Sequence, residues 1–408
     1  MMPFSVEKTS ISVLVCPSGF KGSLSPQKAA DCIESGILAV VPKASIRKVP
    51  LVDGGEGFTE GLMRATGGRI QRTTVTGPVG VPVGSFLGFL GPTSRSSSLT
   101  AVIEIAAAAG LSLVPPHLRN PSVTTTYGVG ELLLAAMDSG AEHIIIGCGD
   151  SGTCDGGAGM LQALGATLLD VHGNPLPLAS GGQSLTHLSS IDLHNVDSRV
   201  KNTVIEVAVN WSNVLCGSSG VARIFGAQKG ATEKDTEELS HAMDVLANVA
   251  GRLLGDPDVG SAPGGGASGG LGTGLRLLGA TLRPRYDVIA EYINFNTLFD
   301  NCDLVLTAEG GIDDQTPRGK IPAEIGTRAK KFGLPVVAIA GTIGPGARVN
   351  YDAGIDAFTC ILQKPSTLDE AVEDAERLTR ESAECVMRMI TVGRMLGSKE
   401  VSRFERRL

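Results

Sequence analysis

The chain has 408 residues, a net charge of −7 and 42% hydrophobic residues, a composition typical of a globular protein with more than one domain. Aromatic residues make up only 4%, and the charge balance is acidic, which excludes the stacking surfaces and basic patches of nucleic-acid binders. No apolar run is long enough to span a membrane, and residues 1–10 lack an apolar or arginine-rich leader. We therefore expect a cytoplasmic protein that binds neither nucleic acid nor membranes.

The eight cysteines show no C-x-x-C spacing and no pairing with histidines at ligand spacing. In a chain of this length, scattered cysteines of this kind are typical of reduced, mostly buried thiols. We expect neither disulfides nor a zinc site.

The N-terminal part alternates between strand and helix patterns. Residues 10–16 predict a strand, and Ser25 followed by proline predicts the start of a helix that runs to about residue 41. A second strand over 46–51 and a second helix over 57–66 follow. This β-α-β-α order predicts a parallel, doubly wound sheet.

The middle of the chain has a different pattern. Residues 68–90 are short alternating runs broken by Gly-Pro and Val-Pro, which predict antiparallel hairpins. Further along, strands are predicted over 143–147 and 203–209, with helices over 157–164 and 233–254. The stretch 255–274 is rich in glycine, proline and serine, and it fits either a linker or a ligand-binding loop.

After residue 285 the strand-helix alternation returns, with short apolar strands predicted over 304–307, 336–340 and 358–362. The fold class is therefore α/β with two α/β domains. Residues 1–75 and 286–408 form a doubly wound, mostly parallel sheet, and residues 76–285 form a second α/β domain inserted into it.

Several predicted strands end in loops that carry polar residues, and parallel sheets bind ligands at that edge. Lys21 follows the first strand and either holds an anion or is a solvated turn residue. Asp53 and Glu56 lie in VDGGEG after the second strand. They either ligate Mg²⁺ or bind hydroxyls, or form a capping box with Asp53 as the cap.

Three loops of the middle segment are further candidates. The hydroxyls of Thr125 and Thr126 suit a phosphate cradle or a helix cap. Residues 147–152 match G-x-G-x-x-G with Asp170 further on, but the third glycine comes too early for a dinucleotide site, so a phosphate loop fits better. Lys229, between glycines, is either a phosphate ligand or a surface turn residue.

The richest loop spans residues 307–320, where three acids are followed by Arg318 and Lys320 directly after a buried strand. Acids for Mg²⁺, cations for phosphates and glycine amides for close approach are the groups that phosphoryl transfer needs. The chain has no Walker A motif, no protein-kinase signature and no G-x-S-x-G elbow.

These loops, in this order, resemble the bacterial-type glycerate kinases, which phosphorylate D-glycerate with ATP to give 2-phosphoglycerate. The matching stretches are FKGSL (20–24), VDGGEG (52–57), TTTYGVG (124–130), DGGAGMLQALG (155–165), FGAQKG (225–230), GGLG (269–272) and residues 303–320. The resemblance covers nearly the whole chain. It implies two α/β domains with the site in the cleft between them.

The resemblance also implies ATP and Mg²⁺ as cofactors, a small carboxylate substrate and a monomer or homodimer. The implied catalytic residues are Lys21, Asp53, Glu56, Asp155, Glu309 and Asp313, with Asp313 and Glu309 also as metal ligands. The implied substrate- or phosphate-binding residues are Ser18, Ser23, Thr125, Thr126, Asn210, Lys229, Gly270, Arg318 and Lys320.

The chain departs from the family pattern at several polar positions. Ser18, Asn210 and Ser212 stand where the family usually has acids, Gly311 stands where it usually has arginine, and residues 149–155 differ as well. Two alternatives to the kinase therefore stay open. One is a lyase, isomerase or cyclase acting on a carboxylated metabolite, and the other is a non-catalytic ligand-binding or scaffold protein.

Overall fold

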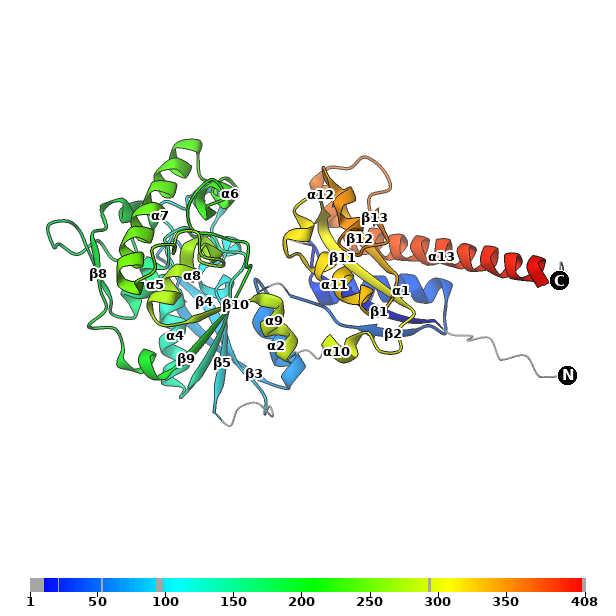
Figure 1. The fold of residues 1–408 in the computed structure, drawn as a ribbon, viewed down its shortest axis with the longest axis horizontal. Coiled ribbons are helices and arrows are strands. Elements are labelled where there is room, and N and C mark those ends of the chain that lie inside the picture. Colours follow the sequence, from blue (N-terminus) through cyan, green and yellow to red (C-terminus); the bar gives the residue numbers. More distant parts are fainter. Residues whose placement is uncertain (1–10, 21, 53, 93–97, 293–294, 406–408) are drawn as a thin grey trace. The chain divides into compact units, whose positions relative to one another are not determined.

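The computed structural model describes residues 11–20, 22–52, 54–92, 98–292 and 295–405, and the side chains among these except those of 295, 296 and 397–405. Contacts divide the chain into two units (Figure 1). The first unit comprises residues 1–52 and 294–408, and the second comprises residues 53–293. The sheets of the two units are separate, and the units are described one after the other.

The first unit holds a five-stranded, entirely parallel sheet in the order β13-β12-β11-β1-β2. N-terminal and C-terminal segments thus share one sheet, as predicted. Its strands and helices are β1 (Ser12–Pro17), α1 (Pro26–Val40), β2 (Ser45–Lys48), α10 (Phe295–Leu298), β11 (Leu304–Ile312), α11 (Ile321–Lys330), β12 (Val336–Ile343), β13 (Ala357–Cys360), α12 (Leu368–Glu373) and α13 (Ala375–Glu405).

Helices α1 and α13 lie side by side over one face of this sheet (Figure 1). Ser25 caps α1 as predicted, because its side chain accepts a hydrogen bond from the Lys28 amide. Gly36 allows the close approach of the two helices, since a Cβ there would collide with the Arg380 carbonyl oxygen. The core of this unit therefore forms where segments more than 300 positions apart meet.

The second unit holds a six-stranded mixed sheet in the order β10-β9-β6-β5-β4-β3 and a separate antiparallel pair, β7-β8. Its strands are β3 (Arg69–Thr76), β4 (Pro82–Phe89), β5 (Thr100–Glu104), β6 (His143–Gly147), β7 (Thr167–Leu169), β8 (Ser190–Asp192), β9 (Val204–Val209) and β10 (Thr281–Pro284). Its helices are α2 (Phe58–Thr66), α3 (Ala106–Ala109), α4 (Tyr127–Asp138), α5 (Ala158–Ala163), α6 (Val221–Phe225), α7 (Glu233–Leu254), α8 (Ala267–Leu277) and α9 (Arg285–Tyr292).

The antiparallel hairpin predicted over residues 68–90 is present as β3 and β4, which pair antiparallel. β4 also pairs antiparallel with β5, whereas the pairs β5–β6, β6–β9 and β9–β10 are parallel. The fold class, two α/β domains with mostly parallel sheets, is thus confirmed. The stretch 255–274 is not a linker, because it folds into the unit: a Cβ at Gly266 would collide with the Val214 carbonyl oxygen.

The predicted domain boundaries were 1–75 with 286–408, and 76–285, and the structure places them differently. Helix α2 and strand β3 belong to the second unit, because β3 pairs with β4 along its whole length and α2 packs on β4 and β5. Helix α9 belongs there too, because it packs on β9. The chain therefore enters the second unit after Val52 rather than at residue 75.

All eight cysteines are free thiols, as predicted. Four are buried, three are partly buried and Cys385 is exposed, so fewer are buried than the sequence predicted. Burial raises the pKa of the Cys148 thiol to about 12 and that of Cys154 to about 11, so these thiols stay protonated at neutral pH. Among the helices that the structure describes, none combines the length and apolarity needed to cross a bilayer.

A buried acidic side chain holds the first helix of the second unit in place at its N-terminus. Glu104, at the end of β5, is 3% exposed, and its carboxylate accepts hydrogen bonds from the backbone amides of Gly57 (3.2 Å) and Thr59 (2.9 Å). These amides begin α2, whose N-cap is Gly57. The capping box with Asp53 as the cap is therefore wrong, since the helix starts four residues later.

Burial raises the pKa of Glu104 from 4.5 to about 7. Between pH 4.5 and about 7, Glu104 is protonated in the folded protein and ionised in the unfolded chain. The free energy of unfolding therefore falls as the pH rises through this window. Relative to Glu104→Gln, the wild type should lose about 3 kcal/mol of unfolding free energy across this window, from 1.36 kcal/mol per pKa unit. Urea unfolding of both proteins between pH 5 and 8 measures it. If the unfolding free energies of the wild type and of Glu104→Gln changed equally with pH, this role of Glu104 would be contradicted.

Candidate active site

The carboxyl edge of the first sheet carries two strands that extend past their neighbour. β1 ends at Pro17, which pairs with Ala308, whereas β11 and β12 remain paired as far as Ile312 and Ile343. Glu309 therefore lies on a two-stranded extension beyond the end of β1. Carboxylates at such an edge stand where parallel sheets bind ligands.

Ser18 lies at the same edge. Its backbone amide donates to the Ala308 carbonyl oxygen (2.8 Å), which places it beside the residue that precedes Glu309. Its hydroxyl donates to the Gly19 carbonyl oxygen (3.2 Å), and the residue is 6% exposed. Ser18 and Glu309 are thus brought together, as the order of strands predicts.

Asp313 is held in a defined orientation just after the strand extension. Its Oδ1 accepts from the Gln315 amide (2.9 Å), the Thr316 hydroxyl (3.2 Å) and Lys320 Nζ (3.3 Å). The Thr316 hydroxyl in turn accepts from the Asp313 amide (3.0 Å), and Asn350 Nδ2 donates to the Asp313 carbonyl oxygen (2.8 Å). Among the described residues, only Lys320 Nζ contacts Oδ2, at 3.5 Å.

Lys320 joins this loop to the strand extension, because Nζ also donates to the Gly311 carbonyl oxygen (3.3 Å). Arg318, two residues earlier, is exposed. Glu309, Asp313, Arg318 and Lys320 thus form an acid-base loop on one unit, which fits the predicted metal-phosphate chemistry. Ser23 lies elsewhere, with its hydroxyl donating to the Val372 carbonyl oxygen (3.5 Å). Lys21 lies outside the described residues.

The second unit contributes a fully buried carboxylate. Asp155 is 0% exposed, and its Oδ2 accepts from the Thr126 amide (2.8 Å), the Thr126 hydroxyl (2.9 Å) and the Gly159 amide (3.2 Å). Its Oδ1 accepts from the Gly157 amide (3.2 Å). Burial raises the pKa of Asp155, although these hydrogen bonds oppose the shift. The carboxylate links the first residues of α4 to those of α5.

The threonine loop before α4 is equally buried. The Thr124 hydroxyl donates to the Gly152 carbonyl oxygen (2.8 Å), and the Thr125 hydroxyl accepts from the Tyr127 amide (3.2 Å). The Thr126 hydroxyl accepts from the Met160 amide (3.1 Å) while it donates to Asp155. All three threonines are at most 1% exposed, so their hydroxyls order the loop itself.

Lys229 is not a surface turn residue. It is 3% exposed, and Nζ donates to the Ser151 hydroxyl (2.8 Å) and to the Thr153 carbonyl oxygen (2.7 Å). Lys229 thereby ties two residues of the 149–155 loop, Ser151 and Thr153, to the segment before α7. Burying an ammonium group is costly, so each of these hydrogen bonds matters to the folded loop.

The acidic loop at residues 54–57 packs on the ends of β6 and β9. A Cβ at Gly54, whose φ is +92°, would lie 3.3 Å from the Cys148 carbonyl oxygen. The Glu56 amide donates to Asp150 Oδ2 (3.2 Å), and Asp150 itself has a positive φ of 49°. Such backbone strain gathers at functional sites. The Glu56 side chain is exposed, and Asp53 lies outside the described residues.

The dinucleotide alternative for residues 147–152 does not fit the structure. Helix α5 begins at Ala158, six residues after the third glycine, so the motif does not open a helix. Asp170 accepts from the amides of His172 and Asn174 (2.8 Å each) and closes a turn.

Two predicted binding residues have local roles. Asn210 follows β9, and its Oδ1 accepts from the amide (3.2 Å) and hydroxyl (2.9 Å) of Ser212. Gly270 is buried with φ +90°, and a Cβ there would lie 2.9 Å from the Gly156 Cα. The structure thus makes Gly270 a packing position between loops.

Glu104, Ser151 and Thr153 are polar residues of this region that sequence reasoning missed. Glu104 alone gave a signal, as a single acid inside the apolar run AVIEIAAAAG. Among the described residues, no group of three or more His, Cys, Asp or Glu side chains could hold a metal ion. Glu309 and Asp313 each offer a carboxylate, the ligand type that Mg²⁺ takes together with substrate phosphates.

Comparison with known proteins bears on these observations. The family model described as glycerate kinase family matches residues 13–391. A Bacillus subtilis (strain 168) glycerate kinase is 44% identical over 91% of this chain and 97% of its own length. The Escherichia coli (strain K12) glycerate 2-kinase is 43% identical over 90% of this chain and 94% of its own length.

A solved structure of a protein described as glycerate kinase 2 from Salmonella typhimurium LT2 has a similar fold. The TM-score is 0.73 at 40% identity, with 95% of this chain and all of that chain covered. Identity at this level over nine-tenths of the chain does not favour the repurposed lyase, isomerase or cyclase. The chain belongs to the glycerate kinase family, whose members are kinases.

Proposed function

We propose that this protein transfers the terminal phosphoryl group of ATP to a hydroxyl of D-glycerate and yields 2-phosphoglycerate. The observation that carries the proposal is the loop after β11. Asp313 lies four residues after Glu309, and three hydrogen-bond donors fix its carboxylate in this loop. Lys320 is one of these donors, so a positive charge lies beside the carboxylate. Relatives named glycerate kinase support the same activity.

Glu309 and Asp313 are the proposed Mg²⁺ ligands. The local hydrogen bonds use Oδ1 of Asp313. Within the described ranges the one contact of Oδ2 is Lys320 Nζ at 3.5 Å, which leaves Oδ2 lone pairs for a cation. When bound, Mg²⁺ and ATP supply the phosphoryl group and neutralise its charge. The chain's own part is to hold the carboxylates in place before the ligands arrive.

Arg318 and Lys320 are the proposed partners of phosphate oxygens or of the substrate carboxylate. A guanidinium binds either anion through two parallel hydrogen bonds, and an ammonium acts as a point charge. We propose Lys21 and Ser18 as further ligand contacts of the first unit. Ser23, whose hydroxyl donates to the Val372 carbonyl oxygen, is not part of this set. Glu56 and Asn210 are the proposed ligand contacts of the second unit.

The buried groups of the second unit are proposed to position the loops rather than to touch the reacting atoms. Asp155 ties the starts of α4 and α5 together, and Lys229 pins residues 151 and 153. Because these loops are already ordered, their backbone amides can bind a ligand without the entropy loss of ordering the loops at that moment. Catalysis of phosphoryl transfer depends mainly on such positioning and on charge.

The charge of Asp313 can be removed without disturbing its loop. In Asp313→Asn the amide oxygen can still accept from Gln315 and Thr316, so the loop should keep its shape. We expect kcat/KM for D-glycerate and ATP to fall by roughly 10²–10⁴-fold, the usual loss for a group that acts at the reacting centre. A coupled assay of ADP release measures it.

Asp314→Asn is the matched control, because Asp314 is the exposed neighbour in the same loop. It should leave kcat/KM within about threefold of the wild type, because Asp314 is exposed and is not among the proposed ligand contacts. Equal effects of the two substitutions would contradict the role of Asp313. No ADP release by the wild-type protein with D-glycerate would contradict the proposed function itself.

Asp155→Asn separates positioning from direct catalysis. In all four hydrogen bonds of the Asp155 side chain, the carboxylate oxygens accept. In the asparagine variant, the amide nitrogen would replace one of these oxygens and would face an N–H or O–H donor with no acceptor between them. We expect the second unit to lose about 1–3 kcal/mol of unfolding free energy, measured by urea denaturation. In the fully folded variant, kcat should fall less than the roughly 10²–10⁴-fold expected for a missing general base. A larger fall at unchanged stability would make Asp155 catalytic.

A further inference from the structure

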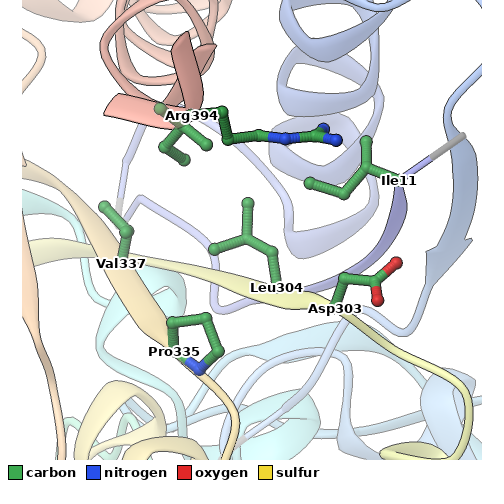
Figure 2. Close-up of a pocket in the computed structure, with 7 residues that line it drawn as sticks. Ile11, Asp303, Leu304, Pro335, Val337 and Arg394 are labelled. Atoms are coloured by element: carbon green, nitrogen blue, oxygen red, sulfur yellow. The ribbon is translucent and has the colours of Figure 1, made fainter. Parts of the chain in front are cut away.

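A pocket of about 410 Å³ lies in the first unit, at the amino ends of three neighbouring strands (Figure 2). Its apolar lining comes from Ile11 before β1, Leu304 at the start of β11, Pro335 and Val337 at the start of β12, and Ile390 of α13. Because the strands are parallel, this edge is the one opposite to their carboxyl ends. The pocket is therefore separate from the acid-base loop after β11.

Two charged residues complete the lining, Arg394 of α13 and Asp303. Figure 2 shows the Arg394 side chain extending along the helix side of the pocket, with Leu304 facing it from the sheet. Within the described part of the chain, no carboxylate pairs with the Arg394 guanidinium. Asp303 is engaged locally, because Oδ2 accepts from the Ser12 amide (2.8 Å).

The chemistry of this lining selects one class of ligand. Ile11, Val337 and Ile390 are only partly buried against the core, so their remaining surface gains by being covered with an apolar group. The guanidinium favours an anion at one end of that group. Asp303 adds a negative charge to the lining, which disfavours a ligand that carries more than one negative charge.

We propose that this pocket binds a small monocarboxylate with an aliphatic tail, the tail resting on Leu304 and Val337 and the carboxylate pairing with Arg394. A volume of about 410 Å³ lies within the range of small-molecule sites. The competing explanation is that the Arg394 stem simply covers the apolar floor while its charge stays in water. In that case no ligand binds.

Isothermal titration calorimetry of the full chain with octanoate tests the proposal. We expect saturable one-site binding that tightens about fourfold for each methylene added from butanoate to octanoate, as buried CH₂ groups do. Octanedioate should bind more weakly than octanoate because its second carboxylate would enter an apolar pocket near Asp303.

Arg394→Gln should weaken octanoate binding about fivefold, the scale of a partly exposed charge pair, and should leave octan-1-ol binding unchanged. Arg388→Gln is the matched control, because Arg388 lies on the same helix, pairs with Glu384 and does not line the pocket. Ile390→Phe fills the pocket and should abolish binding of both probes. Circular dichroism confirms that each variant is folded.

The absence of saturable octanoate binding at about 10 mM would overturn the proposal. Binding that is equally strong in Arg394→Gln, or that survives Ile390→Phe, would overturn it as well, because the ligand would then sit elsewhere. The readout is heat of binding, so it does not depend on kinase activity. Failure here would leave the assignment of the acid-base loop untouched.

Discussion

Two buried carboxylates at helix starts order the second unit. Asp155 accepts donors from the beginnings of α4 and α5, and Glu104 accepts the two amides that begin α2. Helix N-termini carry unpaired amides and a partial positive charge, so a carboxylate there is stabilised even away from water. Burial still raises the pKa of both acids, which shows that desolvation outweighs these bonds. The three loops therefore take their positions from groups that ligands do not reach.

Much of the fold could be predicted from the sequence because its signals are local. The strand at 143–147 and the helix at 233–254 appear with the expected bounds, since an apolar run and an amphipathic repeat are properties of the segments themselves. The sharing of one sheet by the two ends of the chain followed from strand-helix alternation at both ends. The domain boundary could not be predicted in this way, because α2 and β3 have the same local pattern in either unit.

The residues of the candidate site also differ in whether a local sequence pattern could predict their role. Asp313 and Lys320 were predicted from their place in one loop, and the structure brings them within 3.3 Å. Whether Asp155 and Lys229 are buried depends on segments far away in the sequence, and their own glycine-rich surroundings give no local sign of burial. Glu104 does carry such a sign, as a single acid inside an apolar run, and it was missed nonetheless. That the site lies between the two domains stays a prediction.

The altered position 311 bears on the chemistry that the first unit retains. Gly311 stands where the family pattern has arginine, yet its backbone does not require glycine, since a Cβ would meet only the Thr342 hydroxyl at 3.2 Å. The fold therefore did not force the loss of that cation. Lys320 Nζ donates to the Gly311 carbonyl oxygen at 3.3 Å, so a positive charge stands beside this position already. An ammonium is a point charge and does not form the paired hydrogen bonds of a guanidinium, so Lys320 keeps a positive charge beside position 311 without reproducing the geometry of an arginine there.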